Sequence, residues 1–145
     1  MNKSSKHTFT DPVYTIGIAA RMVGLSVHAL RLYEAEGLII THKTDTGRRL
    51  FSDLELEKIE CIHSMVQEEG LNFEGIRRLM ALVPCWKIRS DCSGKKRKSC
   101  DAYKNKTKPC WSTKEKCGHP MQSCRDCTVY QNLVHCEDIQ KYMKP

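Results

Sequence analysis

Apolar positions near the start of the chain predict two short helices joined by a tight turn. In residues 16–23, apolar side chains recur every three to four positions, as they do on one face of a helix. Thr15 can cap this helix and Gly24 ends it, while Ser26 caps a second helix that runs to about Glu36. Two short helices across a glycine-containing turn indicate a helix-turn-helix.

Two short runs of residues around a turn then predict a β-hairpin. Residues 38–41 and 48–51 form the two runs, and an Asp-Thr-Gly turn separates them. A hairpin directly after a helix-turn-helix occupies the position of a wing. The first half of the chain therefore reads as a winged helix-turn-helix.

Helical spacing then returns in two further segments. Ser52 and Glu55 have the spacing of a capping box, which predicts a helix that begins there and stops at Gly70. Asn72 can cap another helix. Pro84 ends this last helix, because a proline pushes the residue before it out of helical geometry.

The composition changes at Pro84. After it, lysines and cysteines are frequent and aliphatic residues are few. We therefore expect a mainly α-helical, winged helix-turn-helix domain over residues 11–83, a small irregular cysteine-rich module over 84–136, and a tail over 137–145. About 60 residues with so few aliphatic side chains cannot bury a sufficient core alone, and bound metal is one source of the missing folding free energy.

The net charge of +7 is concentrated in the second half. Residues 1–84 hold 10 Lys and Arg against 11 Asp and Glu, whereas residues 85–145 hold 14 against 6. A basic surplus suggests a nucleic-acid partner. It also suits thiolates bound to metal, whose negative charge nearby Lys and Arg would offset. Both interpretations stay open.

Nine cysteines point to further chemistry. The first ten residues contain no apolar run, and no stretch approaches the about 18 apolar residues of a membrane span, so we expect a cytoplasmic protein. In a reducing cytoplasm, clustered cysteines are more often metal ligands or redox centres than structural disulfides. A duplicated Cys-Trp pair at Cys85 and Cys110, each with a second cysteine seven positions on, strengthens this expectation.

The predicted metal ligands are the cysteines of the second half, with Cys136 the weakest candidate. They are Cys85, Cys92, Cys100, Cys110, Cys117, Cys124 and Cys127. Only the last two form a tight C-x-x-C pair, so zinc and an iron–sulfur cluster fit about equally. A dithiol switch without metal and inert structural cysteines are the alternatives. Cys61 stands apart on a predicted helix, where we expect a half-buried, inert thiol.

Three segments carry a resemblance to a known family. Residues 14–39 (YTIGIAARMVGLSVHALRLYEAEGLI) and 47–59 (GRRLFSDLELEKI) resemble the DNA-binding domain of the MerR superfamily of transcriptional regulators. Residues 68–82 (EEGLNFEGIRRLMAL), with DPVYTI at the front, are similar to its heat-shock repressor subgroup. This resemblance implies a homodimer on double-stranded DNA with an inverted-repeat operator, repression rather than activation, and an Hsp70 chaperone as a partner.

Two positions depart from the family pattern. Ala29 stands where many relatives have Thr, and the chain breaks at Pro84, where a long dimerisation helix follows in the metal- and drug-sensing members. Without that helix, the tail QNLVHCEDIQKYM predicts a short helix and the remaining dimer surface. Its packing positions are Leu133, Ile139 and Tyr142.

In a helix-turn-helix the second helix enters the major groove, and the wing contacts the backbone. The predicted DNA contacts are Arg31, Tyr33, His28, Arg48, Arg49, Lys43 and Arg21. Tyr33 is equally a core aromatic, and His28 is nearly as well explained as a surface residue without a role. Arg77 and Arg78 are expected to face solvent.

The sequence therefore predicts a DNA-binding transcriptional regulator whose cysteine-rich module senses metal or redox state. The alternative is a regulator whose module is a structural zinc site or a protein-interaction site. An enzyme is disfavoured, because the sequence has no nucleotide-binding glycine loop, flavin signature or paired acid and base.

Overall fold

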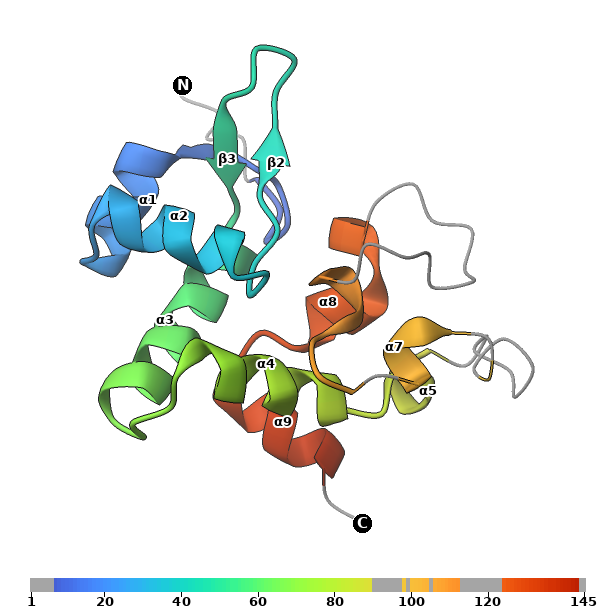
Figure 1. Ribbon diagram of the computed structural model, residues 1–145. Coiled ribbons are helices and arrows are strands. Elements are labelled where there is room, and N and C mark those ends of the chain that lie inside the picture. The colour runs from blue at the N-terminus through green and yellow to red at the C-terminus, as the bar shows by residue number, and fades with distance from the viewer. Residues whose placement is uncertain (1–6, 90–97, 99, 105, 113–123, 144–145) are drawn as a thin grey trace.

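The computed structural model describes residues 7–89, 98, 100–104, 106–112 and 124–143. At one end of the molecule, helices α1 and α2 lie beside a β-hairpin; helix α3 leads from there to α4 and α9 at the other end (Figure 1). Among the described residues, no helix has both the length and the apolar character that a membrane crossing requires.

The predicted helix-turn-helix is confirmed. Helix α1 spans Ile16–Val23 and α2 spans Val27–Ala35. Gly24 adopts a left-handed φ of 70° between them, a conformation that favours glycine. The side chain of Ser26 caps α2 by accepting a hydrogen bond from the Ala29 N–H at 3.0 Å. Thr15 is the N-cap residue of α1, as predicted, but its side chain makes no capping hydrogen bond.

Thr15 also belongs to a strand that the sequence analysis did not predict. Strands β1 (Tyr14–Thr15), β3 (Arg49–Phe51) and β2 (His42–Lys43) form an antiparallel sheet in that order. The predicted strand over 38–41 is wrong. The Tyr130 hydroxyl, rather than a neighbouring strand, bonds the backbone N–H and carbonyl groups of Ile40. It accepts a hydrogen bond from the Ile40 N–H at 2.9 Å and lies 3.2 Å from the Ile40 carbonyl oxygen.

The two later helices begin at the predicted caps. Helix α3 (Asp53–Gln67) starts at the capping box, in which the Glu55 carboxylate accepts the Ser52 N–H at 2.8 Å. Helix α4 (Phe73–Leu82) starts where Asn72 accepts the Gly75 N–H at 2.8 Å. Their inner faces are buried, with Ile59, Ile62 and Ile76 wholly shielded from solvent.

Short helical segments make up the described part of the second half. They are α5 (Cys85–Ile88), α7 (Asp101–Lys104), η1 (Cys110–Ser112), η2 (Cys124–Asp126), α8 (Thr128–Asn132) and α9 (Cys136–Met143). The predicted tail helix is divided in two, because Asp138 caps α9. Its carboxylate accepts the N–H groups of Val134 and His135 at 3.1 and 2.8 Å.

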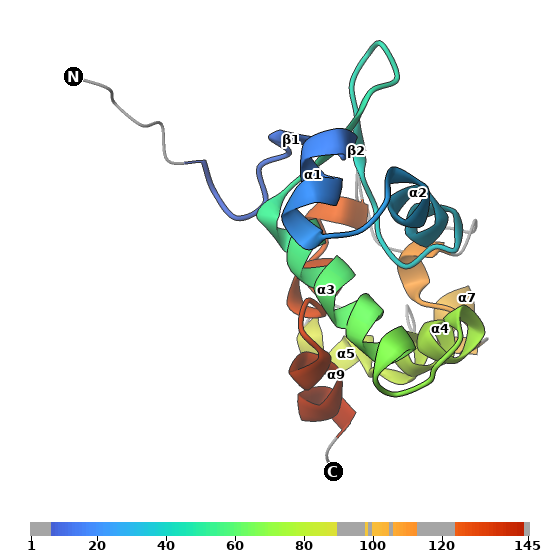
Figure 2. The same ribbon diagram turned by 90° about the vertical axis from the view of Figure 1, so that its left-hand side faces the viewer.

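The tail packs in part on its own chain, and its role as a dimer surface stays a prediction. Leu133 and Ile139 are buried in the same apolar cluster as the cores of α2, α3 and α4. Helix α9 contacts α4 and lies beside α3 (Figures 1 and 2). The predicted packing positions of the tail therefore pack against the chain itself.

One hydrophobic core extends across Pro84. Trp111, Val129 and Tyr130 from the second half join Leu30 and Leu38 from the first in a single cluster of buried side chains. The second half thus obtains a core by packing on the helix-turn-helix half, which offsets its shortage of aliphatic residues. The division of the chain at Pro84 into separate domains stays a prediction.

We expect Tyr130→Phe to lower the free energy of unfolding by about 1–3 kcal/mol, because the half-buried Ile40 N–H and the buried Glu55 carboxylate each lose a partner. Urea unfolding followed by circular dichroism measures this change. Tyr142→Phe is the matched control, since Tyr142 is half-buried on α9. Equal stability of the two variants would contradict the role given to the Tyr130 hydroxyl.

Candidate nucleic-acid interface and the cysteine-rich half

A shallow hollow separates α1, α2 and the turn of the β-hairpin. Its volume is about 210 Å³, and its lining is Thr15, Ile16, Arg31, Gly47, Arg48 and Arg49. Three guanidinium groups, one from α2 and two from the hairpin, therefore border one space. Guanidinium groups bind phosphate oxygens or a guanine edge with paired hydrogen bonds. The fold thus brings three of the predicted DNA contacts together.

Three other residues predicted to contact DNA do not line this hollow. His28 is exposed on α2, Arg21 is exposed in the last turn of α1, and Lys43 is exposed on β2. Their contacts with DNA stay predictions.

The carboxylate of Glu34 ties the hairpin to α2. Its Oε2 lies 2.5 Å from Nε of Arg49, and its Oε1 lies 3.8 Å from Nζ of Lys43. Arg49 is half-buried, whereas Arg48 and Arg31 are exposed. Arg49 therefore also fixes the position of the hairpin, and the other two arginines are more open to an anionic partner.

Tyr33 lies in the core of the helix-turn-helix half. Its side chain is buried, and its ring meets Phe73 of α4 edge to face, with the ring centroids 5.6 Å apart. Burial raises the pKa of its hydroxyl. Of the two roles considered for Tyr33, this placement favours the core aromatic, and a phosphate contact stays a prediction.

Arg77 does not face solvent as expected. Its guanidinium is in contact with the Glu36 carboxylate and donates to the Glu36 carbonyl at 3.3 Å. This ion pair ties α4 to the end of α2. Arg78 is exposed as predicted and pairs with Glu74 one turn earlier on the same helix.

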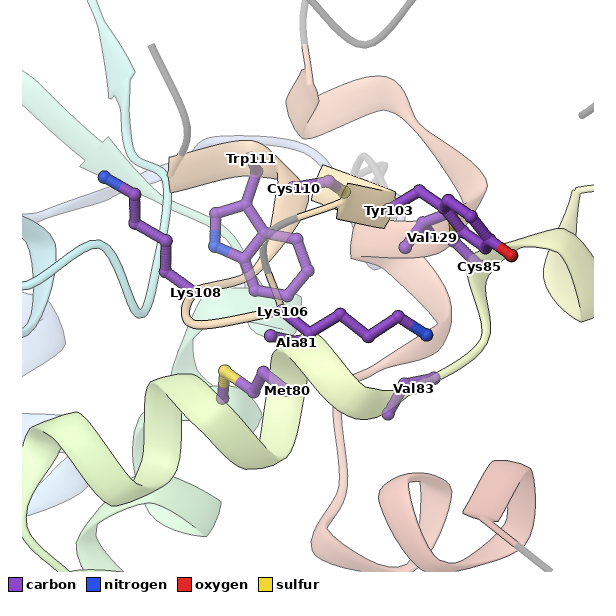
Figure 3. A pocket seen from close by; sticks show the side chains of 10 residues that line it. All are labelled: Met80, Ala81, Val83, Cys85, Tyr103, Lys106, Lys108, Cys110, Trp111 and Val129. Atoms are coloured by element: carbon purple, nitrogen blue, oxygen red, sulfur yellow. The ribbon is translucent and has the colours of Figure 1, made fainter. Parts of the chain in front are cut away.

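The described cysteines of the second half occupy different surroundings. Cys100 and Cys127 are buried, and Sγ of Cys127 lies 3.6 Å from Nη1 of Arg89. Cys85 and Cys110 line a small hollow of about 20 Å³ together with Tyr103 and Trp111 (Figure 3).

Cys124 is exposed, and Cys92 and Cys117 fall outside the described residues. Within the described ranges, no three Cys, His, Asp or Glu side chains gather closely enough to hold a metal ion. The described part of the chain therefore does not form a metal site by itself.

Trp111 joins the cysteine-rich half to the end of α2. Its Nε1 donates to the Gly37 carbonyl at 2.9 Å, and its ring meets that of Tyr130 edge to face at a centroid distance of 5.2 Å. Gly37 has a φ of 75°, and a Cβ at this position would lie 2.7 Å from Cβ of Ser112. One tryptophan of the duplicated motif therefore packs directly against the segment that follows α2.

Glu55, predicted only as a capping-box residue, is a fully buried charge. Its carboxylate is wholly shielded from solvent, and Arg125 reaches both oxygens at 3.2 Å. Arg125 also donates to the Thr10 carbonyl at 2.8 Å, and the Tyr130 hydroxyl lies 3.2 Å from Glu55 Oε1. A residue that caps α3 thus also binds the second half of the chain.

Lys58 is buried one turn further along α3. Its Nζ lies 3.8 Å from the ring centroid of Tyr130 and 4.3 Å from that of Trp111. Within the described part of the chain, Nζ has no hydrogen-bond acceptor. Burial lowers the pKa of Lys58 to about 7, although the nearby Glu55 carboxylate opposes this shift. The ring faces also favour the ammonium form, but desolvation is the larger effect.

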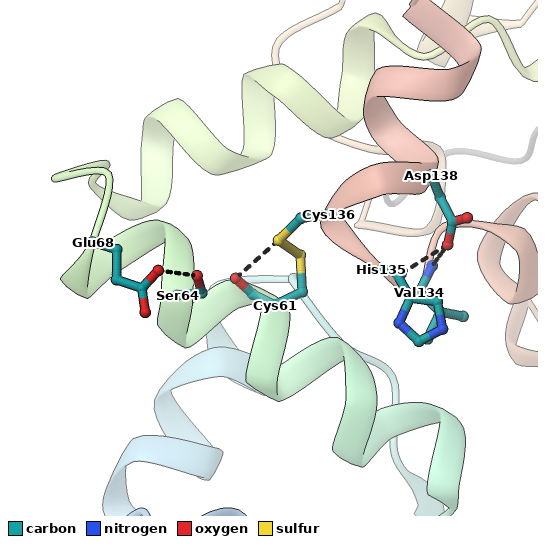
Figure 4. Close-up of a disulfide and its surroundings, with 7 residues drawn as sticks. All are labelled: Cys61, Ser64, Glu68, Val134, His135, Cys136 and Asp138. Carbon is teal, nitrogen blue, oxygen red and sulfur yellow. Dashed lines mark hydrogen bonds between the residues drawn. A yellow bond between two sulfur atoms is a disulfide. The ribbon is translucent and has the colours of Figure 1, made fainter.

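Cys61 is not an inert thiol, because it forms a disulfide with Cys136 (Figure 4). The two Cα atoms are 5.5 Å apart, within the range that a disulfide spans. The sequence analysis did not predict this disulfide, because the two cysteines are separated by 75 positions. It removes Cys136, the weakest candidate, from the predicted metal ligands. Closing a loop of this length stabilises a folded chain by about 2–4 kcal/mol.

The fold and the arginine-lined hollow define the class of protein. Two short helices across a tight turn, with a basic hairpin beside the second helix, form a winged helix-turn-helix, a DNA-binding module. Residues 14–82 match the family model for MerR HTH family regulatory proteins. Residues 14–82 therefore form a helix-turn-helix domain of the MerR type.

Curated proteins with the same type of domain match about half of the chain. HspR of Streptomyces coelicolor, a protein named for heat shock, is 35% identical over 75 residues, which are 52% of this chain and 50% of that protein. The HTH-type transcriptional regulator GlnR of Bacillus cereus is 32% identical over 71 residues, 49% of this chain and 54% of GlnR. The chain thus spans about half the length of these relatives.

The buried amine of Lys58 predicts a pH effect on stability. The folded-state pKa of about 7 lies below the ordinary value of 10.5, so between these values the unfolded chain holds a proton that the folded chain has released. Raising the pH from about 7 to 10 should therefore stabilise the wild type relative to Lys58→Met, by at most about 1.4 kcal/mol per pH unit. Urea unfolding at several pH values measures the difference; a constant difference across this range would contradict the prediction.

Proposed function

We propose that this chain regulates transcription by binding double-stranded DNA with α2 in the major groove and the hairpin on the phosphate backbone. The observation that carries the proposal is the hollow bordered by Arg31, Arg48 and Arg49, at which exposed guanidinium groups from both elements meet. A groove of this kind suits a phosphate or a guanine edge. The match to the MerR family model and the relative named as a transcriptional regulator support the same function.

The form of regulation is the next part of the proposal. A homodimer on an inverted-repeat operator follows from the way helix-turn-helix proteins read two half-sites one or two DNA turns apart. Repression, and an Hsp70 chaperone as a partner, are supported by the similarity to HspR, a protein named for heat shock.

For the cysteine-rich half, we propose a sensor that changes DNA affinity when metal or redox state changes. Zinc and an iron–sulfur cluster remain the candidate cofactors, because seven cysteines follow Pro84 before Cys136. Support for a sensor comes from position: Trp111, directly after Cys110, donates to the Gly37 carbonyl at the end of α2. The alternative is a structural zinc site or a protein-interaction site, which the same packing would accommodate.

Replacing Arg31 by Ala tests the DNA-binding proposal. We expect affinity to fall roughly 5- to 150-fold, corresponding to about 1–3 kcal/mol, because Arg31 borders the hollow and is exposed on α2. Gel-shift titration would use duplex DNA selected from a random pool by the wild type. Arg78→Ala is the control, an exposed arginine of α4 outside the hollow. Undiminished affinity of Arg31→Ala, or an equal loss in the control, would refute the placement of α2.

Metal analysis and an absorption spectrum of anaerobically purified protein test the sensor proposal. Bound iron with absorbance near ~400 nm would identify a cluster, and stoichiometric zinc without colour a zinc site. A sensor changes DNA affinity on metal removal while the circular dichroism of the folded chain persists. A purely structural site would instead unfold when a chelator removes the metal, and a protein free of metal would leave the redox alternative.

A further inference from the structure

The Cys61–Cys136 disulfide joins the two halves of the chain at a site that reagents can reach. Cys61 lies in the middle of α3, and Cys136 is the first residue of α9. Both residues are only half-buried, in contrast to Cys100 and Cys127. Figure 4 shows the bond beside the first turn of α9, with Sγ of Cys136 3.4 Å from the Cys61 carbonyl oxygen.

The bond holds a segment that has few other attachments. Helix α9 contains eight residues, too few for a stable helix in water without packing. Besides the disulfide, α9 contacts α4, buries Ile139 and half-buries Tyr142, and an exposed ion pair joins the preceding His135 to Glu57. Loss of the covalent link therefore removes a large share of what keeps α9 on α3 and α4.

Helix α8 lies directly before this segment and contacts the stretch between the recognition helix α2 and the hairpin. Only Leu133, Val134 and His135 separate α8 from α9. The Tyr130 hydroxyl of α8 bonds the backbone of Ile40 and approaches Glu55 at the start of α3. A change in the docking of α9 is thus passed to the stretch that links α2 to the hairpin.

We propose that thiol–disulfide exchange at Cys61–Cys136 controls the docking of α8 and α9, and through Tyr130 the affinity for DNA. The second clause rests on the proposed function. A DNA-binding regulator works where cellular thiols keep cysteines reduced, and disulfides in such proteins are usually transient and redox-sensing rather than permanent. This pair lies apart from the cysteines proposed as metal ligands.

A dithiol supplies the two electrons and two protons that reduction of the Cys61–Cys136 disulfide requires. One reductant thiolate attacks Sγ of Cys136 or Cys61, the S–S bond breaks, and the released cysteine thiolate takes up a proton. The second reductant thiol, as its thiolate, then attacks the reductant sulfur of the mixed disulfide and releases the remaining cysteine thiolate, which takes up a proton. The protein gains two thiols, and the reductant leaves as its own disulfide, having supplied two electrons and two protons.

Hydrogen exchange followed by mass spectrometry tests the docking clause on the full chain. We expect the amides of residues 136–143 to exchange at least ten-fold faster after reduction with dithiothreitol. The variant Cys61→Ser/Cys136→Ser should exchange as fast as the reduced wild type and should not respond further to reductant. The single variant Cys61→Ser should behave in the same way.

Three results would overturn the proposal. Alkylation of Cys61 and Cys136 in the oxidised protein would mean that the bond does not form. Unchanged exchange of residues 136–143 after the bond is broken would mean that it does not control docking. A reductant response that persists in the double serine variant would assign the switch to other cysteines.

Measuring DNA affinity distinguishes the redox-switch proposal from the proposed DNA-binding function on which it rests. We expect the oxidised and reduced wild type to differ at least three-fold in affinity, and the double serine variant to match the reduced form in either buffer. Equal affinity of the two wild-type forms would overturn the second clause alone. If neither form binds DNA while residues 136–143 still respond to reductant, the proposed function fails and the docking switch stands.

Discussion

The rest of this fold depends on the buried carboxylate of Glu55, which needs partners from both halves of the chain. It caps α3 by accepting the Ser52 N–H, and it is satisfied by Arg125 and the Tyr130 hydroxyl from the far end of the chain. A buried carboxylate that loses its cationic partner costs about 3–5 kcal/mol. The start of α3, immediately after the hairpin, therefore depends on the docking of residues 70 and 75 positions away.

Lys58 imposes a related constraint one turn later. Its amine is enclosed by the rings of Trp111 and Tyr130, so the DNA-binding half would expose both charged residues if the second half departed. The same two aromatic residues bond the backbone of Gly37 and Ile40, between α2 and the hairpin. The conformation of the DNA-binding elements and the docking of the cysteine-rich half are therefore coupled by shared contacts.

Local signals predicted the local structure well. The caps at Ser26, Ser52 and Asn72 act over three residues, and each was correct because the partner lies within one helical turn. Contacts across the chain had no such signal. The bond of Cys61 to Cys136, the burial of Lys58 and the loss of the strand over 38–41 all follow from packing that sequence periodicity does not encode. Three arginines of the candidate site were predicted, but their convergence on one hollow was not.

The most direct test of this coupling is the hydrogen exchange of the Ile40 amide, resolved by nuclear magnetic resonance. Ile40 lies outside regular secondary structure, and its N–H donates to the Tyr130 hydroxyl at 2.9 Å. We expect its protection to approach that of the α3 amides, because both are released only when the shared core opens. Rapid exchange at Ile40, with α3 still protected, would show that the second half does not hold the segment after α2 and would contradict the account.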